Sequence, residues 1–313
     1  MHDTARPGQA GGDAGHGGLP AYVLISPARN EAAFIEMTLQ SMISQSHLPL
    51  KWVIVSDGST DGTDDIVKKY AAEHEWIELL RMPERTERHF AGKVFAFRTG
   101  YEKVKDLTFE IVGNLDADIS FGPDHFEFIL GKFAENPHLG VAGTAFIEDS
   151  SVAYNYEFTN IEHVSGQCQL FRRECYEAIG GYTPRKMGGI DLVAVLTARM
   201  KGWQTRTFPE KIFVHHRKMG TGMHGKMTLL FKSGQVDYIL GSHPIWETVR
   251  SIYQMTNKRP FIIRGAIQIA GFYWAMLKRL KRDVPRDFVE FRRKEQMLRL
   301  SAYFKNKFLL GIL

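Results

Sequence analysis

The sequence predicts an α/β fold in which a mixed, mainly parallel sheet is flanked by helices and followed by a helical C-terminal extension. Two observations lead to this prediction. Short, continuous apolar segments alternate with segments whose apolar residues recur at helical spacing, which is typical of parallel strands covered on both faces. In the last third of the chain this alternation gives way to helical, strongly basic sequence.

Composition is that of a globular protein. The chain has 313 residues, of which 44% are hydrophobic and 24% charged, so it can bury a core and is neither disordered nor fibrous. Its two cysteines, Cys168 and Cys175, form no disulfide framework and have no zinc-ligand spacing, which favours a reducing, cytoplasmic compartment. Residues 1–20 are rich in glycine and lack the apolar core of a secretory signal, so we expect a disordered tail.

The first half of the chain contains four predicted strands, all of them continuous apolar segments: 22–26, 52–56, 76–80 and 109–115. The segments between them are predicted helices: 31–43, 64–74 and 92–104. Past residue 140 the order becomes mixed, with predicted strands at 141–147 and 166–171, a helix at 191–201 and two short strands within 206–216.

Polar clusters follow three of these predicted strands directly. They are Pro-Ala-Arg-Asn-Glu at 27–31, Asp-Gly-Ser at 57–59 and Asp-Ala-Asp at 116–118. In open α/β sheets ligands bind at the carboxyl ends of the strands, so we expect the three clusters to converge on one site. No GxGxxG or GxxxxGK[ST] motif follows a strand, which argues against a dinucleotide site and a P-loop.

The Asp-Ala-Asp cluster is the candidate metal site. Two carboxylates spaced i, i+2 across a bend, Asp116 and Asp118, can share Mg²⁺ or Mn²⁺ and orient it toward a diphosphate. The alternative is a polar turn that caps the helix starting near Pro123. Similarly, Asp57 could accept a hydrogen bond from a base N–H while Gly58 lets the backbone approach, or the segment could be a simple helix-start turn.

The order of four motifs resembles one known family: ISPARNE, IVSDGSTDGT, AGKVFAFRTG and VGNLDADI. It looks like the amino-terminal half of the inverting family 2 glycosyltransferases, which have the GT-A fold. The resemblance covers about residues 21–217, and DGSTDGT followed about sixty residues later by a D-x-D is a specific combination. It implies transfer of a sugar from a nucleotide-diphosphate sugar donor.

The resemblance also assigns roles to individual positions. In the family, the end of the first strand and the Asp of the DGS motif contact the nucleotide, and a basic residue ahead of the third helix lies near the diphosphate. The D-x-D contacts ribose and metal. Nucleotide binding therefore falls to Pro27, Ala28, Arg29, Glu31, Asp57, Lys93, Asp116 and Ala117. Metal binding falls to Asp116, Asp118 and His215.

The acceptor side is expected in the second half of the chain. The segment 166–184, with its glycine pair Gly180-Gly181, resembles the family's acceptor segment. The family then usually has Glu-Asp at a helix start, where the Asp is the catalytic base; here Ile190 replaces the Glu and Asp191 is kept. A carboxylate beside an acceptor hydroxyl can remove its proton, although Asp191 could also serve only as a helix cap.

Four residues near 216 complete the candidate site. His215 and His216 point to opposite faces if they lie in a strand, so only one of them can bind metal, and a satisfied strand-end histidine is the alternative. Arg217 and Lys218 could neutralise the departing diphosphate. The glycine-rich sequence 218–226 is either a flap over the donor or a linker.

The charge of the chain is unevenly distributed. Residues 250–313 hold fifteen Lys and Arg against four Asp and Glu, a net +11, so the remainder carries −6 of the overall +5. Within this region 261–277 is apolar apart from Arg264 and Gln268 and is followed by a basic flank. This pattern favours a helix lying on an anionic bilayer over one packed on the catalytic domain or one that spans. No nucleic-acid motif accompanies the charge.

The predicted organisation is therefore a tail (1–20), a catalytic domain (21–222) and a basic helical extension (223–313). The catalytic domain divides into a nucleotide half (21–120) and an acceptor half (121–222). We expect a peripheral protein on the inner face of the cell membrane that transfers a sugar to a hydroxyl acceptor, sugar or lipid-linked, in surface polysaccharide or glycolipid synthesis.

Two other functions would each account for one feature of the sequence. A catalytically silent protein that binds nucleotide-sugar or membrane would account for Ile190 in place of Glu. A haloacid-dehalogenase-like phosphatase would account for a strand that ends in D-x-D. In those phosphatases the motif closes the first strand, whereas here three predicted strands precede it.

Overall fold

The computed structural model describes residues 18–84, 90–148, 151–152, 161–217, 225–257 and 262–309, so most of the predicted disordered tail lies outside the described residues. The described strands form one nine-stranded sheet. They are β1 Tyr22–Ala28, β2 Lys51–Ser56, β3 Ile77–Arg81, β4 Ile111–Leu115, β5 Ile119–Phe121, β6 Leu139–Glu148, β7 Ser151–Val152, β8 Cys168–Arg172 and β9 Gln204–His215.

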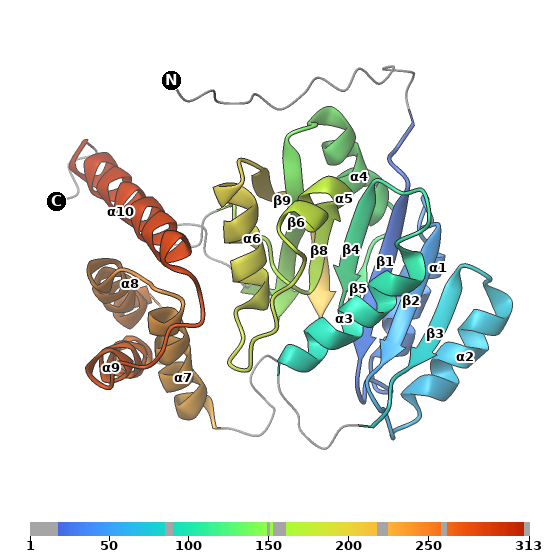
Figure 1. Ribbon diagram of the computed structural model, residues 1–313, viewed down its shortest axis with the longest axis horizontal. Helices are drawn as coiled ribbons and strands as arrows, with labels where there is room; N and C mark the ends of the chain where they lie inside the picture. The colour runs from blue at the N-terminus through green and yellow to red at the C-terminus, as the bar shows by residue number, and fades with distance from the viewer. Residues whose placement is uncertain are drawn as a thin grey trace, which may run out of the picture.

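Helices α1 to α6, which lie between the strands in the chain, pack around the sheet, and helices α7 to α10 follow the last strand (Figure 1). They are α1 Ile35–Ile43, α2 Thr63–Glu73, α3 Ala91–Val104, α4 His125–Glu135, α5 Arg173–Ala178, α6 Ile190–Met200, α7 Lys226–Ile239, α8 Pro244–Asn257, α9 Ile263–Leu277 and α10 Arg286–Leu309. The predicted α/β fold with a helical C-terminal extension is confirmed.

The sheet is mixed but mainly parallel, in the order β3-β2-β1-β4-β8-β6-β9-β5. Strands β1 to β4 are parallel to one another, and β6 is parallel to β9. Strand β8 runs antiparallel between β4 and β6, and β5 runs antiparallel to β9. The carboxyl ends of β1, β2 and β4 therefore meet at one edge, as the position of a ligand site in this class of sheet requires.

Both faces of the sheet are buried, which explains why its strands are continuously apolar. Alternate residues of one strand enter different cores, since successive side chains point to opposite faces. Leu24 lies in the core shared with α1, α2 and α4, and Val23 lies in the core shared with α3, α5 and α6.

Several details differ from the prediction. The two short strands expected within 206–216 are one strand, β9, that pairs along β6 through a register shift at Thr144–Ala145, opposite Pro209. A bulge thus accommodates the proline that looked like a break. The three-residue β5 and the six-residue α5 were not predicted, since segments this short carry little periodic signal.

The C-terminal helices form a closely packed unit beside α6 (Figure 1). A Cβ on Gly234 of α7 would lie 2.0 Å from the Gln268 carbonyl oxygen of α9, and one on Gly265 of α9 would lie 2.2 Å from the Ser251 carbonyl oxygen of α8. Only glycine permits such close helix contacts. Among the helices that the structure describes, none has the length and apolarity needed to cross a bilayer.

A cluster of buried charges joins these helices. Asp237 of α7 accepts hydrogen bonds from Arg250 of α8 and, at 2.9 Å, from Arg292 of α10, and Arg250 also pairs with Glu247, which is fully buried. Burial raises the pKa of Asp237, but the two guanidinium groups lower it by more, so the net pKa is below its usual value. Part of the basic charge noted in the sequence is therefore neutralised inside the protein.

Replacing Asp237 by alanine is expected to lower the free energy of unfolding by about 3–5 kcal/mol, because two buried guanidinium groups lose their shared carboxylate. Urea denaturation measures the change. Glu290→Ala, which removes the exposed partner of Arg286, is the matched control and should cost no more than about 1 kcal/mol. A loss in Asp237→Ala as small as that of the control would contradict a structural role for the cluster.

Candidate active site

The first two polar clusters are tied together at the ends of β1 and β2. The Asp57 amide donates to the Ala28 carbonyl oxygen at 2.8 Å, and the Arg29 guanidinium lies 3.6 Å from the Asp57 carboxylate. The Glu31 amide donates to the Thr63 hydroxyl at 2.8 Å. Asp57 is largely buried, so its carboxylate has little freedom to move at this edge of the sheet.

Asn30 is a residue of this region that the sequence argument did not assign. Its φ is 56°, in the left-handed region that asparagine tolerates better than most residues. Its side-chain oxygen accepts from the Thr60 amide at 2.9 Å, and its own amide donates to the Ser59 hydroxyl at 3.1 Å. These hydrogen bonds join the DGSTDGT loop to the segment that follows β1. Each of the two segments therefore helps to fix the conformation of the other.

Asp116 lies at the end of β4 among groups that fix its position. The Lys93 ammonium of α3 pairs with Asp116 Oδ1, and Asn114 Nδ2 donates to the same oxygen at 3.0 Å. Lys93 and Asn114 also donate to the Gly166 carbonyl oxygen, at 3.2 and 2.6 Å. Burial raises the pKa of Asp116, and Asp118 adds to the rise while Lys93 opposes it. Asn114 was missed, although an amide in an otherwise apolar strand was a visible signal.

Asp118 faces the end of β9. Its Oδ2 lies 3.5 Å from both His215 Nε2 and Arg217 Nε, and its Oδ1 is buried without a hydrogen-bond partner among the described residues. Burial lowers the pKa of His215, but Asp118 and Asp116 raise it by more, so the net pKa is above its usual value. A cation beside this carboxylate would satisfy the oxygen that has no partner in the described part of the chain.

Glu31 lies on the other side of Arg217. The guanidinium pairs with the Glu31 carboxylate and donates to the Asn30 carbonyl oxygen at 3.0 Å. Burial, with a contribution from Asp118, raises the pKa of Glu31 to about 7, although Arg217 opposes the rise. The ends of β1, β2 and β4 therefore carry several carboxylates that are paired with three basic groups: Arg29, Lys93 and Arg217. Such an arrangement is suited to a polyanionic ligand with a cation.

Two predicted nucleotide-binding residues remain, Ala117 and Pro27. The Ala117 side chain is buried in the core, so only its peptide groups are available to a ligand. Pro27 pairs in register with Val55 of β2 and continues the strand.

The two histidines point in different directions, as alternation along a strand requires. His215 faces Asp118, whereas His216 Nε2 lies 2.8 Å from the Ser120 hydroxyl and its ring stacks on Phe34. Of the predicted pair, only His215 directs its side chain at the Asp118 carboxylate, whereas His216 contacts Asp118 through its backbone amide, which donates to the Asp118 carbonyl oxygen at 2.9 Å. Lys218 and most of the predicted flap, 218–224, lie outside the described residues.

Asp191, the predicted base, lies in the first turn of α6 and packs against Gly166; the N-cap of this helix is Gly189, so the alternative role of Asp191 as a helix cap is wrong. A Cβ on Gly166 would lie 3.0 Å from the Asp191 Cβ, so the two segments touch. Asp191 also lies near His163. Burial lowers the pKa of His163, and the Asp191 carboxylate opposes this effect. Ile190 is buried in the core with Val195. Gly166 thus connects the Lys93–Asp116 pair to Asp191, a connection that sequence spacing could not reveal.

Replacing Gly166 by alanine is expected to displace Asp191 by a few tenths of an ångström and to lower kcat on the order of tenfold, because catalytic geometry tolerates little displacement. The substrate KM should stay unchanged, which steady-state kinetics measures. Gly131→Ala in α4, where a Cβ meets nothing within 4 Å, is the control. Equal kcat in the two variants would show that the Gly166 contact does not position Asp191.

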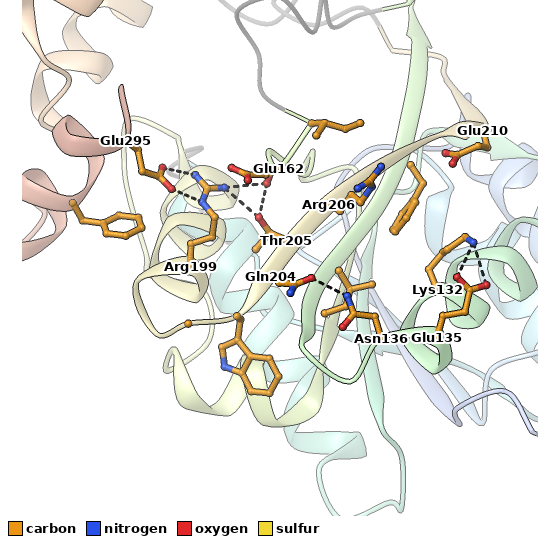
Figure 2. Close-up of a pocket in the computed structure, with 16 residues that line it drawn as sticks. Lys132, Glu135, Asn136, Glu162, Arg199, Gln204, Thr205, Arg206, Glu210 and Glu295 are labelled. Atoms are coloured by element: carbon orange, nitrogen blue, oxygen red, sulfur yellow. Dashed lines mark hydrogen bonds and ion pairs between the residues drawn. The ribbon is translucent and has the colours of Figure 1, made fainter. Parts of the chain in front are cut away.

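A cavity of about 660 Å³ lies elsewhere, at the amino-terminal ends of β6 and β9 (Figure 2). Figure 2 shows two ion pairs among its charged residues: Arg199 pairs with Glu295, and Lys132 with Glu135. None of the predicted site residues lines it. The strand-end cluster therefore remains the candidate active site. Within the described residues, no group of three or more His, Cys, Asp or Glu is arranged to hold a metal ion by itself.

Comparison with known proteins agrees with this fold. The profile of glycosyl transferase family 2 matches residues 23–180, about half of the chain. The chain therefore belongs to glycosyl transferase family 2. The match includes all three polar clusters and ends at Gly180, before Asp191 and His215.

Curated relatives are similar over part of their length. The chain is 32% identical over 108 residues to the putative teichuronic acid biosynthesis glycosyltransferase TuaG of Bacillus subtilis, which is 34% of this chain and 40% of TuaG. It is 29% identical over 127 residues to the poly-beta-1,6-N-acetyl-D-glucosamine synthase of Staphylococcus epidermidis, 39% of this chain and 28% of the synthase. The chain thus spans well under half of these relatives.

Among solved structures, the mannosyltransferase PcManGT of Pyrobaculum calidifontis, in complex with GDP-Man and Mn²⁺, is similar with a TM-score of 0.55. The identity is 21%, and the match covers 91% of this chain and 82% of that structure. GalNAc-T7 with UDP, GalNAc and Mn²⁺ gives a TM-score of 0.54 at 13% identity, over 83% and 56% of the two chains. Both likenesses concern the fold, and the GT-A fold is confirmed.

Proposed function

We propose that this chain transfers a sugar, with inversion, from a nucleotide-diphosphate sugar to a hydroxyl acceptor, in surface polysaccharide or glycolipid synthesis. The observation that carries the proposal is the convergence of Asp57, Asp116 and Asp118 at the carboxyl ends of β2 and β4, beside β1. Relatives named for teichuronic acid and poly-N-acetylglucosamine support the polysaccharide context.

In this proposal Arg29 and Asp57 hold the base of the nucleotide. Their partly buried ion pair at the ends of β1 and β2 offers hydrogen-bonding groups, and Gly58, with φ of 70°, lets the backbone turn there. Lys93 and Arg217 lie on two sides of the Asp-Ala-Asp cluster and would balance the negative charge of the diphosphate.

The residues present fit a divalent metal, Mg²⁺ or Mn²⁺. The unpaired, buried Asp118 Oδ1 and the neighbouring His215 Nε2 are ligands of the type that Mn²⁺ accepts, and Asp116 lies two residues away. When bound, the ion would neutralise charge on the diphosphate leaving group. The Mn²⁺ complexes among proteins of similar fold are consistent with this assignment.

Asp191 is proposed as the base. Its carboxylate would take the proton of the acceptor hydroxyl while the hydroxyl oxygen bonds to the anomeric carbon and the bond from that carbon to the diphosphate breaks. The nucleoside diphosphate leaves with the bonding electrons. Attack on the face opposite the leaving group inverts the configuration.

A scan of nucleotide-sugars with Mg²⁺ or Mn²⁺, reading release of nucleoside diphosphate, tests the proposal. We expect release with at least one donor, dependent on metal and lost in Asp118→Ala. If neither nucleotide binding nor release responds to metal, the proposal fails. Metal-dependent binding without any release would favour a silent nucleotide-sugar-binding protein, in which Ile190 marks a lost function.

The acceptor is proposed to be a sugar, free or lipid-linked, reached from the inner face of the cell membrane. The basic extension supports a peripheral position there, since anionic lipids attract juxtaposed Lys and Arg.

A further inference from the structure

Helix α9 exposes one apolar side. Leu277 is 79% exposed, Ile263 45% and Trp274 42%, whereas Gln268, Gly271, Phe272 and Ala275 are buried. Ile263 and Trp274 are eleven residues apart, about three helical turns, and Leu277 follows one turn later. The exposed residues therefore form a continuous stripe on the side of α9 opposite its packed side.

Helix α8 continues this surface. Ile245 and Ile252 are each 53% exposed and lie two turns apart on one side of α8. The Thr248 hydroxyl lies 2.9 Å from the Tyr273 hydroxyl, so α8 and α9 are neighbours. Both stripes lie opposite the side that contributes to the buried polar cluster, Glu247 on α8 and Gln268 on α9, and so both face outward.

Basic residues border this apolar surface. The chain that leaves α9 directly after Leu277 exposes Lys278, Arg279, Lys281 and Arg282. The one acid among them, Asp283, is engaged with Arg185 at 2.6 Å. An apolar stripe with a tryptophan, bordered by cations, complements an anionic lipid surface: apolar groups enter the acyl region and cations meet the headgroups.

The surface is also connected to the candidate acceptor loop. Buried Arg185, which pairs with Asp283, lies six residues before Asp191 in the loop that leads to α6. In the same loop, a Cβ on Gly189 would lie 2.8 Å from Leu240 at the end of α7. The helical unit that carries the stripe thus packs directly on the segment that ends at Asp191.

We propose that the α8–α9 hairpin docks on an anionic lipid bilayer through Ile245, Ile252, Ile263, Trp274 and Leu277, with residues 278–282 on the headgroups. A consequence, which rests on the proposed function, is that Asp191 receives its acceptor hydroxyl from a lipid-linked sugar held in the same bilayer. The docking itself does not depend on catalysis and is tested without it.

The intrinsic fluorescence of the full-length chain tests the docking. Vesicles that contain phosphatidylglycerol are expected to shift the emission to the blue and to retain the protein in flotation, whereas neutral phosphatidylcholine vesicles should retain little. Trp274 is the most exposed tryptophan of the described residues, while Trp52 and Trp246 are buried. Trp274→Phe should therefore abolish the shift but keep flotation, because phenylalanine also inserts. A shift that persists in Trp274→Phe would overturn this orientation.

Two further variants separate the apolar and ionic contributions. Leu277→Glu should abolish flotation, whereas Leu50→Glu, at a position 51% exposed in the sheet domain, should not change it. Replacing Lys278, Arg279 and Lys281 together by glutamine should weaken binding to the anionic vesicles on the order of a hundredfold. An unchanged midpoint of urea denaturation in all variants shows that they fold, and because this control needs no nucleotide it separates the docking test from that of the proposed function.

Two outcomes would overturn the proposal. One is no flotation of the wild type on anionic vesicles. The other is a concentration-dependent dimer, seen by light scattering without lipid and lost in Leu277→Glu, which would assign the stripe to a second copy of the chain.

Discussion

Replacing Asp118 by asparagine is expected to lower kcat/KM for sugar transfer on the order of 10³-fold, because metal stabilisation of the leaving group contributes several kcal/mol to such reactions. The variant keeps the size of the side chain but removes the charge that faces His215 and Arg217. Nucleotide binding measured by calorimetry should lose its dependence on Mg²⁺ or Mn²⁺. Transfer rates with saturating metal give the size of the effect.

The matched control is Asp124→Asn. Asp124 is exposed, pairs with Lys211 and lies six residues further along the same segment. Its replacement should leave metal-dependent binding and transfer at the wild-type level. If Asp118→Asn retained metal-dependent nucleotide binding, the metal would have to be held by other residues, and the assignment of Asp118 would be wrong.

Replacing Asp191 by asparagine is expected to lower kcat on the order of 10²–10⁴-fold, the usual contribution of a general base. Donor and metal affinity should stay at the wild-type level, since Asp191 contacts the site through Gly166 and lies outside the nucleotide clusters. Single-turnover transfer measures the first quantity and nucleotide titration the second.

Asp65→Asn controls for the effect of a charge at a helix start. Asp65 lies in the first turn of α2, as Asp191 lies in that of α6, and it is exposed. The free energy of unfolding of the control should fall by only the few tenths of a kcal/mol that a carboxylate contributes near a helix N-terminus. A wild-type kcat in Asp191→Asn would exclude it as the base and leave the replacement of the family's Glu by Ile190 as a sign of a different chemistry.

Much of the donor side could be predicted from the sequence because its signals are local. Buried parallel strands must be apolar throughout, so β1, β2 and β4 are visible as segments, and the polar residues that end each of them are adjacent in the chain. Topology then brings these ends together without further information. The positions of Asp57, Asp116 and Asp118 follow from this reasoning.

The contacts that shape the site were not predictable in the same way. Asn30, Ser59 and Thr63 tie two loops through bonds about thirty residues apart in the chain, and Lys93 and Asn114 meet Gly166 across more than fifty. No periodicity links such positions, since their meeting depends on how helices pack on the sheet. The Arg250–Asp237–Arg292 cluster was equally unpredictable, because the sequence does not distinguish a buried, paired arginine from an arginine on the surface.

By itself, the sequence determined the alternating strands and helices, the three polar strand ends and the basic, partly apolar C-terminal region, because each is set by neighbouring residues. Tertiary structure decided which histidine faces Asp118, that Gly166 touches Asp191, and that α9 buries one side while exposing Ile263, Trp274 and Leu277. The physical reason is the same in each case: whether a side chain is buried, paired or exposed depends on what packs against it, and that partner is distant in the chain.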